Sequence, residues 1–256
     1  MAVLNLYKEV GETPLARIER FKKKHPAYKE VAMTYLGRLD PLAEGVLLIG
    51  VEVDDATRQA VMSLPKTYEL DVVGGASTDT HDLLGLVVAC IDRLEPVKID
   101  QWTLVEYLAS QQGVQEQKYP DYSSKPVQGE PLFSLARRGA LDPVERPVHQ
   151  IEIYKLALTK LTEITGRELL LESKRKVDLV HGDFRQEIIQ GCWERTLGSL
   201  YDVSFPIISL TIEASAGTYM RVIADELGQN LGFPSLAYAI RRIAVGDYDQ
   251  SKSLRE

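Results

Sequence analysis

The sequence has few cysteines and no long apolar run, and each shortage excludes a class of protein. Its two cysteines, Cys90 and Cys192, lie far apart without histidine or further cysteine at metal-ligand spacing. We therefore expect neither a disulfide framework nor a metal site. No stretch approaches the ~20 apolar residues of a membrane-spanning helix, and no basic segment precedes an apolar core at the N-terminus. These features predict a cytoplasmic protein without a membrane partner.

Positive charge is also in short supply. The 256 residues carry a net charge of -7, which argues against indiscriminate nucleic-acid binding, whereas 45% hydrophobic and 26% charged residues are typical of a folded domain. The cations are nevertheless clustered, and such clusters could form a basic face on an acidic body. They lie at residues 22–24, 137–138, 174–176 and 241–242.

Local signals predict several helices. Thr13-Pro14 is typical of a helix start, and Leu15, Ile18 and Phe21 would face the core until His25-Pro26 ends the helix. Asp54-Asp55 opens a short helix, and Asp100 caps another whose buried stripe would be Trp102, Val105, Leu108 and Ala109. A further helix over about 218–230 would turn Met220, Ile223 and Leu227 inward and end at Leu231-Gly232.

Strand signals alternate irregularly with these helices. They cover residues 45–52, 67–74, 84–91, 147–158, 206–214 and 236–248. The absence of strict strand–helix alternation predicts an α+β fold, with a mixed, largely antiparallel central sheet flanked by helices. Charged residues 160–205, with helical spacing of Val177, Val180, Phe184 and Ile188, look like an insertion between two strands of a single domain spanning 1–256.

Asp40 stands on a loop of residues 37–45 that leads directly into the apolar run 46–51. Pro41 pushes Asp40 out of the helical region and removes the next backbone donor, so the carboxylate is held on an extended turn. Gly37 and Gly45 permit tight reversals on either side. An isolated Asp-Pro pair is usually only a turn before a strand, so other segments must decide whether Asp40 is functional.

Two distant segments carry side chains that suit a nucleotide. Lys66 and Tyr68 share one face of an expected strand, where they would fit a phosphate and a base, although a packed core tyrosine explains the pattern equally well. Tyr219 and Arg221 lie in the first turn of an expected helix, near free backbone N–H groups. The alternative for Arg221 is a weak surface pair with Asp225.

Six blocks in a compatible order and spacing give the most specific signal. They are GRLDPLAEGVL (37–47), KTYEL (66–70), STDTHDLLG (77–85), YSSKPVQGEPLFSLARRG (122–139), SAGTYMRVIADELG (215–228) and AYAIRRIAVGDY (237–248). Together they resemble the TruB family of tRNA pseudouridine synthases, over roughly residues 2–160 and 206–248. Six ordered blocks are far more specific than any single short motif.

The resemblance implies the pseudouridine synthase fold and isomerisation of a uridine in RNA. The glycosidic bond is cut, the base turns, and C5 replaces N1 as the atom joined to ribose. Asp40 would be the nucleophile, Arg221 its counter-ion, and Tyr68 a stacking partner of the uracil, which must flip out of its stem-loop. Tyr219 would contact the base or the backbone, and Ile240 would wall the pocket. The scheme requires neither a metal nor an organic cofactor.

Two residues beside the nucleophile depart from the family pattern. Tyr35 replaces a usual histidine, which keeps an aromatic plane and loses a titratable nitrogen. Arg38 replaces a small residue and would either bind phosphate or compete with Arg221 for Asp40. The expected contacts with substrate RNA are Tyr35, Arg38, Lys66, Tyr219, Ile240 and Arg241.

The full expectation is a tRNA pseudouridine(55) synthase that acts on the T arm of tRNA as a monomer, with no required protein partner. We expect no C-terminal RNA-binding PUA domain, and residues 160–205, with Lys174-Arg175-Lys176, could replace its surface. Two alternatives stay open at this stage. One is a non-catalytic RNA-binding or RNA-folding protein on the same scaffold, and the other is a pseudouridine synthase for a different RNA.

Overall fold

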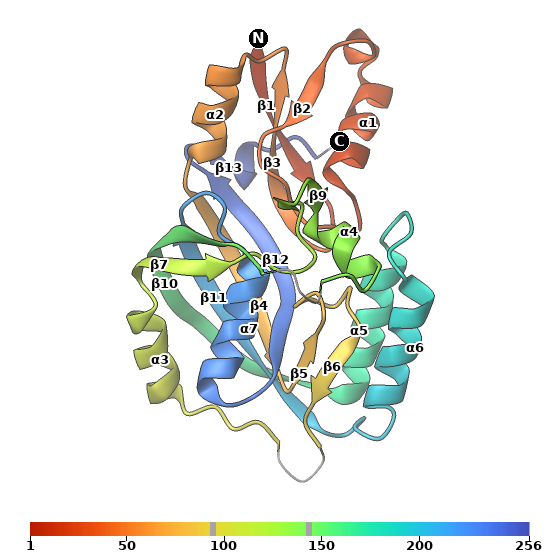
Figure 1. The fold of residues 1–256 in the computed structure, drawn as a ribbon, viewed down its shortest axis with the longest axis vertical. Helices are drawn as coiled ribbons and strands as arrows, with labels where there is room; N and C mark the ends of the chain where they lie inside the picture. The colour runs from red at the N-terminus through yellow and green to blue at the C-terminus, as the bar shows by residue number, and fades with distance from the viewer. Residues whose placement is uncertain (93–95, 142–144, 256) are drawn as a thin grey trace.

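A nine-stranded mixed sheet forms the centre of the computed structural model, which describes residues 1–92, 96–141 and 145–255 (Figure 1). Its strands follow the order β1-β3-β12-β4-β11-β10-β7, and only the β12–β3 pair is parallel. The α+β prediction is therefore confirmed. The strands are β1 (Ala2–Lys8), β3 (Glu44–Val51), β12 (Ser235–Val245), β4 (Lys66–Gly74), β11 (Ser204–Ala214), β10 (Val148–Thr165) and β7 (Gly113–Lys118), with β2 (Met33–Tyr35) on β3 and β13 (Tyr248–Asp249) on β12.

Helices and short hairpins surround the sheet. Helices α1, α3 and α7 contribute to one apolar core with β3, β4, β10 and β11, while α2 packs in a smaller cluster on the other side of β3. The helices are α1 (Pro14–Lys24), α2 (Asp55–Ser63), α3 (Gln101–Ser110), α4 (Leu132–Arg137), α5 (Gly166–Asp178), α6 (Gln186–Leu197) and α7 (Met220–Leu231), and the hairpins are β5 (Ala76–Thr78) with β6 (Val87–Cys90) and β8 (Pro126–Val127) with β9 (Glu130–Pro131).

The predicted helix starts are confirmed, but two of the predicted buried faces are partly wrong. Thr13, Asp54 and Asp100 each accept a hydrogen bond from a first-turn N–H group. In α1 the buried face holds Pro14, Arg17, Ile18 and Phe21, whereas Leu15 is 58% exposed. The reason is geometric: Leu15 lies one residue from the stripe at i, i+3, i+4 and i+7, so it points to solvent.

Helix α3 is shifted in the same way. Leu104 and Leu108 are its buried residues, whereas Trp102 is 72% exposed and Val105 and Ala109 are exposed as well. Leu104 and Leu108 lie four residues apart on one face, so the prediction was right for Leu108 and was drawn about a quarter of a turn away for the rest of the stripe. Helix α7 keeps the predicted face, with Met220, Ile223 and Leu227 buried, and ends at Gly232 with a positive φ of 86°.

Residues 160–205 contain a helical pair between two neighbouring strands. Strand β10 continues to Thr165, which pairs with Ser204 of β11, and helices α5 and α6 fill the connection. The single helical pattern through Ile188 was wrong, because α5 ends at Asp178 and Ile189, not Ile188, is buried. The pair lies beside β6 (Figure 1), and its apolar faces form a second core with β5–β6.

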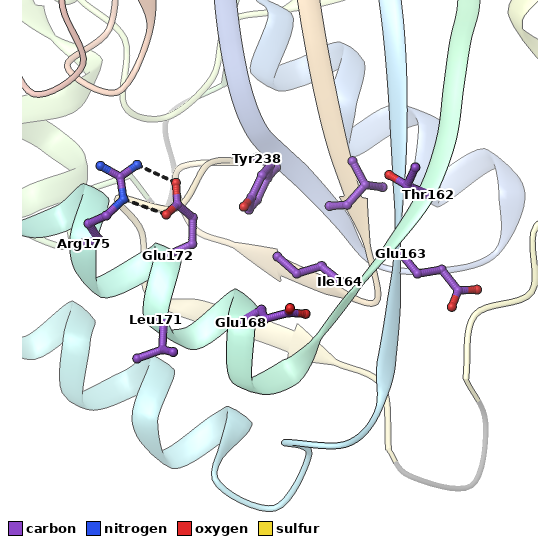
Figure 2. A pocket seen from close by; sticks show the side chains of 9 residues that line it. Thr162, Glu163, Ile164, Glu168, Leu171, Glu172, Arg175 and Tyr238 are labelled. Atoms are coloured by element: carbon purple, nitrogen blue, oxygen red, sulfur yellow. Dashed lines mark hydrogen bonds and ion pairs between the residues drawn. The ribbon is translucent and has the colours of Figure 1, made fainter.

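The basic triplet of α5 is neutralised within the protein. Lys174 forms an ion pair with Glu194 at 2.5 Å. Figure 2 shows that Arg175 donates to both carboxylate oxygens of Glu172, at 2.6 and 2.7 Å. Lys176 is buried, and its ammonium nitrogen lies over the ring of Tyr238, 4.1 Å from the ring centroid. Of these cations, Arg175 borders an open groove between α5 and the sheet. The structure thus gives the triplet internal partners instead of a free basic surface.

The two ends of the described chain meet. Leu254 pairs with Leu6 of β1, and its carbonyl oxygen accepts hydrogen bonds from the Tyr7 N–H and the guanidinium of the buried Arg17. Cys90 and Cys192 are free cysteines in the described part of the chain. Among the described residues no helix has the length and apolar character needed to cross a bilayer.

Candidate active site

Asp40 lies on the loop between β2 and β3, directly before Pro41. Its side chain is 32% exposed, so one side of the carboxylate faces the protein and the other is open to a ligand. The Asp40 carbonyl accepts a hydrogen bond from Ala43, and Pro41 accepts one from Gly11. The Asp-Pro turn predicted from the sequence is therefore present and is held by the adjoining chain.

Arg221 meets Asp40 across 181 residues of sequence. It occupies the first turn of α7, and its Nε and Nη2 atoms lie 2.8 and 3.4 Å from Oδ2 and Oδ1 of Asp40. The Arg221 side chain is only 3% exposed. Bidentate pairing of this kind fixes both the position and the orientation of the carboxylate. The expected contact between Arg221 and Asp40 is present, and among the described residues the ion pairs of Arg221 are with Asp40 and Asp82 and not with Asp225.

Three further acceptors orient the Arg221 guanidinium. Nη1 donates to the Thr80 carbonyl at 2.6 Å, Nη2 donates to the Tyr122 carbonyl at 3.2 Å, and Nε lies 3.8 Å from the Asp82 carboxylate. Burial raises the pKa of the Asp82 carboxyl group, while Arg221 and the hydroxyl of Thr80 act in the opposite direction. Asp82 is thus a second carboxylate facing Arg221.

Aromatic rings lie beside this ion pair. The backbone of Tyr219 is held by both ends of the Gln117 amide, at 2.8 and 3.2 Å. The Tyr219 ring stands edge-on to Tyr119 and His149, which stack on each other with centroids 4.2 Å apart. The pKa of the Tyr219 hydroxyl is raised, first by burial and then by the negative charge of Asp40. This second cause places the phenol within electrostatic reach of the nucleophile candidate.

Tyr68 and Ile240 approach from the sheet. Tyr68 is 8% exposed on β4, and it belongs to the same apolar core as Leu39, Met220 and Ile240. Leu39 and Met220 directly precede Asp40 and Arg221 in the sequence. Tyr68 therefore packs in the core cluster that lies behind the ion pair. This position fits both interpretations of Tyr68, as a core residue and as a site residue.

Two buried cations that the sequence analysis missed hold the Asp40 loop from behind. Arg242 donates to the carbonyls of Val46, Gly37 and Arg38 at 2.8, 3.1 and 3.3 Å. The Lys8 ammonium donates to the carbonyls of Ala43, Glu9 and Pro41 at 2.5, 3.0 and 3.2 Å. In the sequence, Lys8 and Arg242 are recognisable only as cations at the end or on the inward face of a strand. That position does not show which groups the side chain will contact.

A family model described as the TruB family pseudouridylate synthase, N-terminal domain, matches residues 24–178, which contain the Asp40 loop, Tyr68 and Asp82. The match covers more than half of the 256 residues.

The chain belongs to the TruB family.

Named relatives of this TruB-family chain extend the likeness over nearly its whole length. It is 32% identical over 248 residues to the tRNA pseudouridine synthase B of Bacillus subtilis, which covers 96% of the chain and 65% of that protein. It is 29% identical over 244 residues to the protein of the same name from Syntrophomonas wolfei, covering 95% and 66%. The chain thus spans about two thirds of the length of these relatives.

The TruB-family chain also shares its fold with a distant solved structure. A Cbf5-Nop10-Gar1 complex matches with a TM-score of 0.56 at 15% identity, over 97% of this chain and 50% of the other. At this identity the likeness concerns the fold alone.

Two arginines near the Asp40 loop of this TruB-family chain differ in their partners. Arg38 donates to the Tyr35 hydroxyl at 2.9 Å and lies over its ring, so it does not compete with Arg221 for Asp40. Arg241 forms ion pairs with Glu44 and Glu69 at 2.9 and 3.1 Å. Arg38 therefore has a neutral partner, whereas Arg241 is bound to two carboxylates.

Lys66 has a different place from the one expected of an RNA contact. It is buried, and its ammonium donates to the carbonyls of Met62 and Leu64, each at 2.5 Å, at the C-terminal end of α2. These carbonyls lack helical partners, and a cation satisfies them well. Lys66 therefore differs from the expected RNA contact because the carbonyls at the end of α2 bind its ammonium group.

Proposed function

We propose that this chain isomerises a uridine in the T arm of tRNA (position 55 in tRNA numbering) to pseudouridine, with Asp40 as the nucleophile. The observation that carries the proposal is the bidentate contact of the partly exposed Asp40 with the buried Arg221. Membership of the TruB family and the two relatives named tRNA pseudouridine synthase B support the same reaction.

The reaction asks little of the protein beyond positioning and charge. The N1–C1′ bond breaks, the C5–C1′ bond forms, a proton leaves C5 and N1 gains one, so atoms and electrons balance without an external oxidant. A carboxylate at Asp40 suits attack on an electron-poor centre, and the Arg221 guanidinium fixes its orientation. Tyr68 and Tyr219 supply rings for the extruded base, and stacking offsets the few kcal/mol that extrusion costs.

Tritium release from tRNA carrying [5-³H]uridine tests this proposal, because the C5 hydrogen must leave. We expect release by the unmodified protein and none above background for Asp40→Asn, while RNA binding is retained. Asp202→Asn, on an exposed turn before β11, is the matched control and should keep full activity. Turnover by Asp40→Asn would refute the role of Asp40.

Two other outcomes identify the alternatives. Binding of tRNA without any tritium release by the unmodified protein would favour a non-catalytic RNA-binding or RNA-folding protein. Release from another RNA but not from the T-arm uridine would keep the enzyme and change its substrate. Mapping of pseudouridines in RNA from cells with and without the gene separates these cases. Action as a monomer without a protein partner stays a prediction of the sequence.

A further inference from the structure

The charge of the helical pair α5–α6 does not explain why the chain contains it. Strands β10 and β11 are antiparallel neighbours, and such strands can be joined by a two-residue turn. The chain instead spends residues 166–203 on this connection. Residues 160–205 hold seven basic and eight acidic side chains, and the basic triplet of α5 is occupied by internal contacts. The pair is therefore a poor general surface for phosphates.

One side chain of the pair reaches toward the Asp40–Arg221 site. Arg185 precedes α6 in a left-handed conformation, with φ of 64°, which is uncommon for a residue other than glycine. Its guanidinium lies 2.9 Å from Oδ2 and 3.4 Å from Oδ1 of Asp79, and 4.8 Å from the ring centroid of Tyr122. The Tyr122 hydroxyl also donates to Asp79, at 3.1 Å. The three side chains thus form one closed cluster.

The cluster joins the two segments that orient Arg221. Asp79 lies in the turn that supplies the Thr80 carbonyl and the Asp82 carboxylate to Arg221, and Tyr122 supplies its own carbonyl. The other Asp79 oxygen accepts a hydrogen bond from the Leu86 N–H at 2.8 Å, which closes the turn.

A second contact ties the same loop to the same region of the molecule. Arg137 of α4 donates to the Asp183 carbonyl at 2.9 Å and lies over the ring of Phe184. The loop between α5 and α6 therefore holds both the Tyr122 segment and the helix that follows it. In Figure 1 this end of the helical pair lies next to α4.

We propose that Arg185 is a positioning residue of the active site: by bracing Asp79 against Tyr122, it holds the two segments that aim Arg221 at Asp40. The helical pair carries Arg185 to that place, and its packing against β6 keeps the guanidinium there. Among the described residues, the Arg185 guanidinium contacts Asp79 and Tyr122 and not Asp40. An effect of Arg185 on catalysis rests on the proposed function, whereas the bracing of Asp79 and Tyr122 by Arg185 does not depend on it.

Hydrogen–deuterium exchange tests the bracing without any assay of activity. In Arg185→Met we expect the Leu86 amide and the peptides covering residues 119–137 to exchange roughly tenfold faster than in the unmodified protein. Arg195→Met removes an exposed cation from the last turn of α6 and should change neither region. Arg185→Lys keeps the charge and loses the second nitrogen, so its exchange rates should fall between those of the unmodified protein and Arg185→Met. The same variant replaces Arg185→Met in the test if Arg185→Met folds poorly.

Equal exchange at Leu86 and residues 119–137 in Arg185→Met and Arg195→Met would overturn the proposal. Kinetics on tRNA then decide the catalytic consequence: we expect kcat to fall roughly tenfold for Arg185→Met with KM changed less than about twofold. Adding Asp79→Asn to Arg185→Met should cause little further loss, because both changes break the same cluster. A rise in KM alone would identify Arg185 as an RNA contact instead. If the unmodified protein released no tritium from tRNA, the proposed function would fail, and the exchange result would still decide the bracing.

Discussion

Lys8 and Arg242 lie behind the Asp40 loop, and their nitrogen atoms bind backbone carbonyls instead of carboxylates. A buried cation costs free energy unless its donors are matched, and these two side chains match theirs to the carbonyls of one loop. Gly45 permits the close approach of β12, since a Cβ atom there would lie 2.2 Å from the Arg242 carbonyl oxygen. The backbone that presents Asp40 is therefore held on both sides by residues that never touch the carboxylate.

Lys8 gives a pH-dependent prediction at this scale. Burial lowers the pKa of its ammonium group to about 7 in the folded chain, from the usual 10.5. Between these values the unfolded chain holds a proton that the folded chain has released, so folding becomes more favourable as the pH rises above 7. Relative to Lys8→Met, which cannot titrate, the unmodified protein should gain about 2 kcal/mol of unfolding free energy between pH 7 and pH 9.

Urea unfolding of both proteins at the two pH values measures this gain. Below pH 7 the ammonium is charged in both states, so the difference between the proteins should level off there. A difference that stays constant from pH 7 to pH 9 would contradict the assigned shift of the Lys8 pKa.

At the scale of elements, the α5–α6 pair depends on one large side chain. Trp193 is fully buried, and its indole N–H donates to the Leu83 carbonyl at 3.2 Å. Leu83 follows Asp82 directly, so the same contact links the helical pair to the turn that faces Arg221. The packing of the pair and the geometry of the site are coupled through this turn.

Trp193→Ala should lower the unfolding free energy by about 3–5 kcal/mol, because a cavity forms and the Leu83 carbonyl loses its donor. The chain contains a matched control in its other tryptophan, Trp102, which is 72% exposed. Trp102→Ala should change stability by less than about 0.5 kcal/mol. Chemical denaturation of both variants makes the comparison, and equal losses would show that the α5–α6 core does not depend on Trp193.

For the whole molecule, the net charge of -7 has to be reconciled with the RNA substrate proposed above. Several cations are bound to internal partners, including Lys66, Arg241 and the triplet of α5. Because affinity for a polyanion depends on cations that can displace counter-ions, the paired cations should contribute little to it. Arg38, which donates to the neutral hydroxyl of Tyr35, differs from them in this respect.

Two variants compare these classes of cation. We expect the double variant Lys174→Gln/Arg175→Gln to leave tRNA affinity within about twofold and the salt slope unchanged, because Glu194 and Glu172 already neutralise these cations. Arg38→Gln should reduce the log–log salt slope by about one. Filter binding over a range of salt concentrations measures both slopes. A smaller slope for the double variant would restore the α5 triplet as an RNA-binding surface.

Local patterns in the sequence determined the helix starts at Thr13, Asp54 and Asp100, most strand positions and the turn at Asp40, because caps, proline and hydrophobic spacing act over a few residues. The ordered motifs also identified Asp40 and Arg221 as members of one site. Only the tertiary structure decided which cations stay free, since Lys66, Lys8, Arg242 and Arg185 find their acceptors on segments whose approach no local rule describes.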